Sequence, residues 1–299
     1  MKVSKFIVVV LVGLAMVMLG CAGEEPTKVE KSPTPPLAET TTPTVAPTQT
    51  PTPTPTVSEL KLKVGESAQT SRLEVTVKDV FKTKVISGDY GNYWAEDGKV
   101  FIFAVVNIKN IDTELKAWYV GPSDFAMSDE TGRRYDVRYM SVDGYFEGGD
   151  LNPNEYREGL IAFEVPENVK TIKIKYDFGG LFGVKLATWE ANMDEIPTKE
   201  PKVKILGGEV KYKTSILGYQ VEKVTIDVKN EGELPIYLSK VEIKYGTKDW
   251  KTLGYPDKIL KPSEEKTIEE TEFEILDSKP AVVEVRFVDD EHVIAEGSI

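Results

Sequence analysis

Alternation of apolar and polar residues most restricts what this 299-residue chain can fold into. The longest alternating segment places five apolar residues at every second position: Val100, Ile102, Ala104, Val106 and Ile108. A period of two puts these side chains on one face of an extended strand and leaves the other face in water. No stretch beyond residue 20 has the 3.6-residue period of a helix, so we expect a chain built from strands.

Several shorter segments alternate in the same way, with turn-forming residues between them. Many short strands separated by turns are typical of a β-sandwich. The alternation lapses over residues 191–201, which are polar and contain two prolines, and then resumes. We therefore predict an all-β fold with two tandem immunoglobulin-like β-sandwich domains, at residues 58–190 and 202–299, joined by a linker at 191–201.

The two expected domains share two landmarks in the same order. A strand ends on Lys-Asn at Asn110 and again at Asn230, and a proline turn at residues 151–155 resembles another at 260–264. Asparagine opens turns by bonding to nearby backbone, and proline presets a turn before a strand. We expect one sandwich built twice, although turns of this kind also occur in unrelated β domains.

The N-terminus has the features of an export signal. Residues 1–20 begin with two lysines and continue as an apolar run over 6–19, which is short for a membrane span of about 20 residues. Cys21 follows a glycine at the end of this run, which resembles a lipoprotein signal whose cysteine becomes the lipid-bearing first residue. Met18 and Leu19 depart from the usual pattern, so an uncleaved anchor and plain secretion are alternatives. All three place the later residues outside the cytoplasm, and lipid anchoring puts them on the outer face of the cell membrane.

Residues 21–57 are expected to form a disordered, lipid-anchored linker. Within residues 24–57, nine of 34 are proline and eleven are threonine, and large apolar side chains are scarce. Burial therefore cannot offset the entropy lost on folding. The Thr-Pro tract favours an extended stalk that lifts the domains away from a membrane, and its composition is also that of O-glycosylated stalks.

Composition excludes several classes of function. Cys21 is the only cysteine, so the folded part contains no disulfide, no thiolate metal site and no cysteine nucleophile. The formal net charge of −12 makes nucleic acid and anionic lipid headgroups poor candidates as partners. Glutamine occurs three times whereas Lys and Glu are frequent, a bias typical of proteins from very hot environments.

Three segments of the first domain carry a family resemblance: residues 98–114, 123–137 and 151–176. Their strand patterns and turns are similar to those of DUF4352, the telokin-like extracellular domains, over about residues 60–190. The chain has Pro153-Asn154 where family members usually have Pro-Gly. The resemblance implies an immunoglobulin-like sandwich, often displayed on a bacterial or archaeal surface lipoprotein, without established catalytic residues. The second domain is loosely similar to FxLYD or CARDB modules.

No group of residues strongly predicts a catalytic or metal site. His292 is the only histidine, and we expect it to lie with the acidic residues 289–291 in a solvated turn between the last two strands. Zinc sites usually have several nitrogen or sulfur ligands, which this chain lacks. A weak calcium candidate, with an ordinary exposed loop as its alternative, consists of Asp143, Glu147 and Asp150. We expect no cofactor and no catalytic residue.

Aromatic residues in the connections form the candidate recognition surface. Its predicted members are Tyr90, Tyr93, Trp94, Tyr145 and Phe146, with Tyr119 and Tyr139 in other connections. Such side chains can stack on sugars or anchor a protein partner, and they can equally cap the ends of the core.

These features favour a cell-surface lipoprotein with a binding or structural role rather than an enzyme. An envelope protein or a glycan is the expected partner. The alternative is a hydrolase of cell-surface polymers that uses a pair of carboxylates. Aromatic side chains around a shared groove would favour a glycan, whereas a flat patch or a bare sheet edge would favour a protein.

The proposed lipid anchor can be tested by labelling cells with an alkyne fatty acid. We expect label on the wild-type chain and none on Cys21→Ser, because the thiol is the only acceptor for the acyl chain that the signal provides. The two proteins should also separate on detergent extraction. Identical extraction without label on either protein would contradict acylation.

Overall fold

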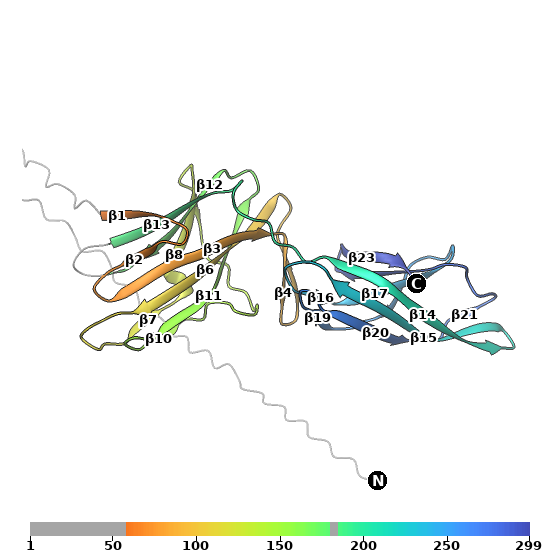
Figure 1. Cartoon of the computed structure of the whole chain (residues 1–299). Coiled ribbons are helices and arrows are strands. Elements are labelled where there is room, and N and C mark those ends of the chain that lie inside the picture. Colours follow the sequence, from red (N-terminus) through yellow and green to blue (C-terminus); the bar gives the residue numbers. More distant parts are fainter. Residues whose placement is uncertain (1–57, 180–184) are drawn as a thin grey trace, which may run out of the picture. The chain divides into compact units, whose positions relative to one another are not determined.

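The computed structural model describes residues 58–179 and 185–299, which are built almost entirely from strands (Figure 1). Within these residues the one helical element is the 3-10 turn η1 (Pro122–Asp124), and no helix is long and apolar enough to cross a membrane. The predicted all-β fold is therefore confirmed. Cys21, the export signal and the Thr/Pro-rich segment lie outside the described residues.

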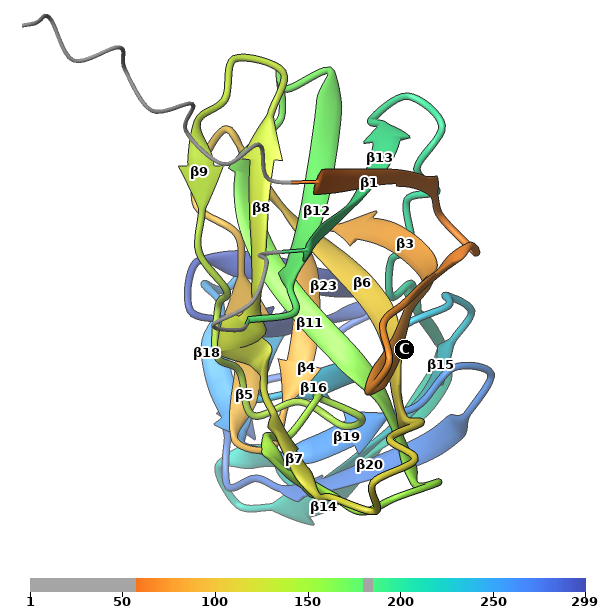
Figure 2. The same cartoon turned by 90° about the vertical axis from the view of Figure 1, so that its left-hand side faces the viewer.

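Two sheets pack face to face in the first sandwich. One sheet has the strand order β1 (Ser58–Lys63), β13 (Lys185–Asn192), β12 (Thr171–Asp177), β8 (Phe125–Asp129) and β9 (Arg134–Tyr135). The other has the order β11 (Tyr156–Pro166), β6 (Lys99–Asn110), β3 (Leu73–Thr83) and β2 (Ser67–Gln69). Figure 2 shows the first of these sheets in front of β11, β6 and β3. All pairings are antiparallel except that of β1, which lies parallel to β13.

Alternate residues of these strands fill the space between the two sheets. Ile102 and Ile108 of β6, Ile174 of β12 and Trp189 of β13 are fully buried there. The indole N–H of Trp189 donates to the carbonyl of Glu66 at 2.8 Å, so its polar atom is satisfied inside the core. This is the buried face that the period of two predicts.

The opposite face of β6 differs from the sequence prediction. Alternation places it in water, yet Phe101 and Phe103 are buried there and pack with Phe81 of β3. Exposing each ring to water would cost about 2 kcal/mol, so this face needs a cover of its own. A hairpin of β4 (Val85–Gly88) and β5 (Gly91–Trp94) and the segment 138–146 supply that cover.

The second sandwich also has two antiparallel sheets. One contains β14 (Val203–Ser215), β15 (Gly218–Asn230) and β20 (Glu265–Thr271), with β21 (Ile275–Leu276) paired to β15. The other contains β18 (Lys251–Gly254), β17 (Lys240–Tyr245), β22 (Val283–Asp289) and β23 (His292–Ser298). Its buried core includes Val224, Ile226, Val241, Ile243, Val285 and Phe287.

The order of strand pairing is the same in the two sandwiches. The ladder β3–β6–β11 corresponds to β14–β15–β20, and β9–β8–β12–β13 corresponds to β18–β17–β22–β23. Each sandwich also has a small two-stranded ladder, which pairs β7 (Trp118–Val120) with β10 (Gly149–Leu151) and β16 (Ile236–Leu238) with β19 (Lys258–Leu260). The chain therefore repeats one sandwich, as its two landmarks predict. The domain limits at residues 190 and 202 stay a prediction.

The landmark asparagines make equivalent hydrogen bonds in the two repeats. The side-chain amide of Asn110 donates to the carbonyls of Lys116 and Leu151, both at 2.8 Å. That of Asn230 donates to the carbonyls of Leu234 and Leu260, at 2.7 and 3.0 Å. Both side chains are completely buried. Each asparagine therefore ties the end of a central strand to the small ladder of its own sandwich.

The backbone around each asparagine also repeats. Asn110 accepts from the N–H of Asn154, and Asn230 accepts from the N–H of Ser263. Asn154 and Ser263 both have positive φ, at 66° and 63°. Asparagine tolerates this left-handed conformation better than most residues do, which explains why Asn154 serves where the family usually has glycine.

We expect Asn110→Ala to lower the free energy of unfolding of the first sandwich by about 2 kcal/mol, because the carbonyls of Leu151, which is buried, and of Lys116 lose their donor. Urea unfolding of the full chain measures this. Asn107→Ala on the same strand is the matched control, since Asn107 is only half-buried and makes one long bond of 3.4 Å. Equal losses for the two variants would contradict the role assigned to Asn110.

Candidate functional site

The two repeats differ most in two connections. Residues 84–98 join β3 to β6 and include the β4–β5 hairpin, whereas residues 216–217 alone join β14 to β15. Residues 136–148 join β9 to β10, whereas residues 255–257 join β18 to β19. Segments that a sandwich can form without are the places to look for function. In the first sandwich these two long connections lie against each other.

Hydrogen bonds join the hairpin to the segment 138–146. Asp89 donates its backbone N–H to the carbonyl of Ser141 at 3.0 Å and accepts from the Ser141 hydroxyl on its carboxylate. The backbone N–H of Ser141 donates to the hydroxyl of Tyr93 at 3.2 Å. A Cβ on Gly88 would lie 2.6 Å from the Tyr93 ring and 2.8 Å from the Ser141 carbonyl. Only glycine at this position lets the two segments approach so closely.

A concave feature of this sandwich lies beside that junction. It is an open groove of about 610 Å³, formed by the hairpin, the β7–η1 connection and residues 139–148. We call it the tyrosine groove. Its lining consists of Asp89, Tyr119, Pro122, Ser123, Tyr139, Met140, Ser141, Val142, Tyr145, Phe146, Glu147 and Gly148.

Three tyrosines present their rings along the groove. Tyr119 and Tyr139 are each 68% exposed, whereas Tyr145 is half-buried and donates its hydroxyl to the Arg138 carbonyl at 2.9 Å. Burial, and then the neighbouring Tyr139, raises the pKa of Tyr145 above its ordinary value, so its hydroxyl stays protonated in physiological conditions. The groove thus combines two exposed tyrosine rings with a third that is held in place by its hydrogen bond.

Glycines make room for these rings and for the floor beneath them. A Cβ on Gly148 would lie 2.7 Å from the hydroxyl of Tyr119, at the far end of an exposed side chain. A Cβ on Gly159 of β11 would instead lie 2.7 Å from the Cα of Phe146, which is backbone of the groove floor. Phe146 itself is fully buried and meets Phe125 edge to face in the core.

The charge of the groove is negative. Asp89 and Glu147 contribute carboxylates, and the set of lining residues contains no lysine or arginine. Serine hydroxyls at Ser123 and Ser141 add further polar atoms. An apolar and aromatic hollow with a few polar groups is the usual form of a small-molecule or sugar site.

Two members of the predicted recognition surface do not face solvent as expected. Phe146 belongs to the core, because residues 145–147 follow the backbone of β11 and turn this ring inward. Trp94 is half-buried against the second sandwich, where its ring stacks on His292 with centroids 3.9 Å apart. Tyr90 is 92% exposed but lies outside the groove lining. Tyr93, on β5 of the hairpin, packs against the apolar cluster of Phe81, Phe101 and Phe103. Tyr145 and Phe146 are the predicted members that line the groove, and Phe146 does so as part of its buried floor.

The expectation of a solvated turn around His292 is also wrong in part. Asp289 is buried and accepts from the indole N–H of Trp94 at 2.6 Å, from Asn92 at 2.9 Å and from Ser239 at 2.7 Å. This carboxylate therefore holds the β4–β5 hairpin to the end of β22. Sequence alone gives no sign of it, because its partners are 195 and 197 positions away.

The calcium candidate does not form a site. Asp143, Glu147 and Asp150 are exposed, and the described residues contain no group of three or more side chains that could hold a metal. Arg157 donates to the carbonyl of Glu147 at 2.8 Å, which places a cation where calcium would need oxygen ligands. Glu147 instead lines the tyrosine groove.

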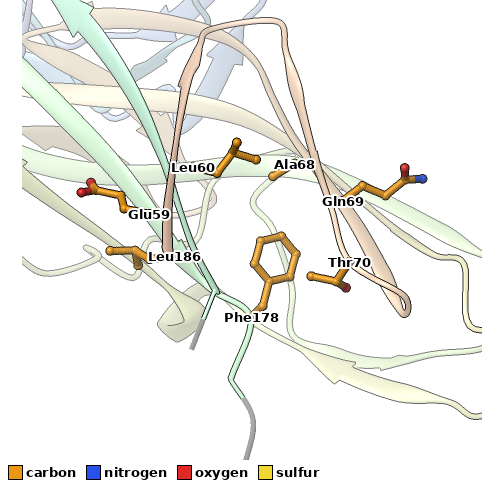
Figure 3. A pocket seen from close by; sticks show the side chains of 7 residues that line it. All are labelled: Glu59, Leu60, Ala68, Gln69, Thr70, Phe178 and Leu186. Carbon is orange, nitrogen blue, oxygen red and sulfur yellow. The ribbon is translucent and has the colours of Figure 1, made fainter. Parts of the chain in front are cut away.

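A second hollow, of about 230 Å³, lies at the edge where β1 and β2 meet β13. Figure 3 shows the ring of Phe178 between Leu186 on one side and Thr70 on the other, with Leu60 and Ala68 above it. Residues 180–184, between Phe178 and Leu186, lie outside the described residues, so we assign no site here.

Comparison with known families identifies the domain that carries the groove. Residues 62–187 match DUF4352, a domain of unknown function. The first sandwich is a DUF4352 domain. The predicted resemblance is thus confirmed, and all residues of the tyrosine groove lie inside the matched region. The resemblance of the second sandwich to FxLYD or CARDB modules stays a prediction.

Solved structures similar to this chain include β-sandwich and secreted proteins of low identity. An uncharacterized β-sandwich protein of Clostridium difficile is 17% identical over 45% of this chain and 97% of its own, with a TM-score of 0.33. The Bacillus subtilis protein ycdA, described as a candidate lipoprotein, is 11% identical over 56% and 73%, with a TM-score of 0.37. The secreted MPT63 of Mycobacterium tuberculosis is 14% identical over 46% and 100%, with a TM-score of 0.34. No curated protein matches the chain.

Two glycine substitutions should separate the floor of the groove from its rim. We expect Gly159→Ala to lower the free energy of unfolding by about 2 kcal/mol, because the new methyl group meets backbone that cannot move aside. Gly148→Ala should cost less than about 1 kcal/mol, since the exposed Tyr119 side chain can rotate away. Urea unfolding of both variants measures the difference, and a larger loss for Gly148→Ala would contradict this assignment of floor and rim.

Proposed function

We propose that this protein is a cell-surface lipoprotein that binds glycan chains in the tyrosine groove and does not cleave them. The observation that carries the proposal is the convergence of Tyr119, Tyr139 and Tyr145 with Asp89 and Glu147 around one open hollow. These residues come from the β4–β5 turn, from strand β7 and from the connection 136–148, so the groove is a product of the fold rather than of one loop.

The chemistry of the lining suits a sugar chain. Aromatic rings present large, rigid apolar faces, against which the C–H faces of a pyranose can stack. Carboxylates accept hydrogen bonds from sugar hydroxyls, and such charge-assisted bonds are stronger than neutral ones. An open groove of about 610 Å³, rather than a closed pocket, can hold part of a chain that extends beyond it.

The charge of the lining favours neutral or amino-bearing sugars. Asp89 and Glu147 would repel a uronate or a sulfated chain, and the lining residues include no cation to offset them. A free amino group on a hexosamine would gain from the same two carboxylates. Preference among glycans of equal length is therefore a direct consequence of the lining.

Features outside the described residues support the surface location. The apolar leader, Cys21 and the Thr/Pro-rich segment together predict export, acylation and a stalk. A tethered binding domain gains effective concentration near its own cell surface, so a weak groove can serve there.

We favour binding over hydrolysis because of the engagement of Asp89. Its carboxylate accepts from the Ser141 hydroxyl, and its backbone pairs with Ser141 as well, so it helps to hold the two connections together. A glycosidase needs one carboxyl group that can keep its proton and deliver it to the leaving oxygen. The Asp89 carboxylate is instead engaged with Ser141 and is part of the framework that shapes the groove.

Binding of three six-unit glycans to the full chain tests the proposal: neutral cellohexaose, the cationic glucosamine hexamer and anionic hexagalacturonate. We expect calorimetry to detect the first two and not the third. Tyr139→Ala should weaken binding roughly tenfold, the value of one stacked ring. Mass spectrometry should find all three glycans intact after prolonged incubation.

Tyr90→Ala is the matched control, because Tyr90 is a more exposed tyrosine that lies outside the lining. Its affinity for cellohexaose should equal that of the wild type. Tightest binding of hexagalacturonate, equal losses in the two tyrosine variants, or no binding of any glycan would contradict the proposal. Shortened products would instead support the hydrolase.

A further inference from the structure

The turn of the β14–β15 hairpin exposes two large aliphatic side chains that the fold does not require. β14 and β15 are each 13 residues long, and their register closes at Ser215 and Gly218, which leaves Ile216 and Leu217 as the turn (Figure 1). Ile216 is fully exposed, and Leu217 is 66% exposed. We call this turn the apolar tip. Its place in the fold is independent of the tyrosine groove and of the function proposed for it.

Turn chemistry does not explain the apolar tip. Two-residue hairpin turns favour asparagine, aspartate and glycine, because these residues accept positive φ and tolerate water. Neither Ile216 nor Leu217 has positive φ; Gly218 alone supplies it, at 125°. The Ser215 hydroxyl accepts from the N–H of Leu217 at 3.0 Å and so stabilises the turn without help from either aliphatic side chain. Two polar residues would serve the turn equally well.

Aromatic and cationic side chains surround the apolar tip. Tyr212 and Tyr219 lie behind the turn, and the amine of Lys279 lies 5.3 and 5.4 Å from their ring centroids. Lys211 and Lys213 are exposed on β14. Strand β21 pairs with Tyr219 and Gln220 and adds exposed apolar surface at Ile275.

Local charge near the tip is opposite in sign to that of the whole chain. Between Glu209 and Glu222 the hairpin contains two lysines and no carboxylate. Lys279 adds a third cation, and the acidic residue Asp277 lies beside Gly218. Charges farther away than a Debye length of about 10 Å contribute little, so the net charge of −12 does not decide what this end binds.

We propose that the apolar tip inserts into the surface of a lipid bilayer that carries anionic headgroups. Aliphatic side chains on a protruding turn can enter a deformable lipid phase, whereas they would find no matching hollow on a flat protein surface. Tyrosine is enriched at the depth of the headgroups, and lysine gains from anionic lipid just outside it. The hairpin carries all three kinds of side chain within a few residues of the turn: Ile216 and Leu217, Tyr212 and Tyr219, and Lys211 and Lys213. Two aliphatic residues give weak insertion alone, and the lysines supply the second contribution that stable attachment needs.

The single cysteine of the chain allows a direct test. In full chain carrying Cys21→Ser, a second substitution, Ile216→Cys, gives one thiol for an environment-sensitive dye. The vesicles contain phosphatidylcholine and about 30% phosphatidylglycerol, whose anionic headgroups give the surface a negative potential. With these vesicles we expect a blue shift of the dye and quenching by brominated lipid tails. Pure phosphatidylcholine should give a much smaller change. The leader is the same in every sample, so differences between them report on the tip.

Tyr255→Cys in the same Cys21→Ser chain is the matched control. Tyr255 is 66% exposed in the connection before β19, and β19 lies at the Asn230 end of the sandwich, away from the tip. A dye there should stay in water. Lys211→Glu with Lys213→Glu should weaken the response at position 216 roughly tenfold or more. No shift at 216 with saturating anionic lipid, equal shifts at the two positions, or an equal response to pure phosphatidylcholine would overturn the proposal.

Discussion

The architecture depends on a buried asparagine side chain that joins each central strand to the edge of its sandwich. Asn110 and Asn230 satisfy two carbonyls each, and no apolar side chain could do so in the same space. One carbonyl of each pair, that of Leu151 or Leu260, belongs to the small ladder, and the other lies in the connection that leads to this ladder. The asparagine therefore holds the chain both where it leaves the central strand and where it returns. The same hydrogen bonds occur in both sandwiches, so the two share this arrangement although their other connections differ.

A second constraint acts on the DUF4352 domain alone. The rings of Phe81, Phe101 and Phe103 make both faces of one sheet apolar, so a further layer has to cover them. That layer is also the body of the tyrosine groove, since Tyr93, Met140 and Val142 pack inward while Tyr139 stays exposed. Burial of the inward side chains thus holds the groove in shape, and the side chains of this layer that stay exposed, such as Tyr139, are the ones available to a ligand.

The repeats have diverged at equivalent positions. The connection after the first strand of the shared ladder is a long hairpin in one sandwich and the apolar tip in the other. The first is held by the buried carboxylate of Asp289, and its Asp89 lines the groove. The second is short and ends in water. One scaffold therefore presents two chemically different surfaces, a carboxylate and tyrosine groove and an aliphatic and lysine tip.

The sequence by itself determined the strands, the two-sandwich plan and the paired asparagines, because period-two alternation and local turn chemistry act over a few residues. It also determined the absence of disulfides in the folded part. Only the tertiary structure decided which aromatic residues meet a ligand. Phe146 and Tyr145 are neighbours in an irregular connection, where no period tells which side chain faces inward. The roles of Trp94 and Asp289 likewise depend on a contact between distant segments, and such contacts leave no pattern in the chain.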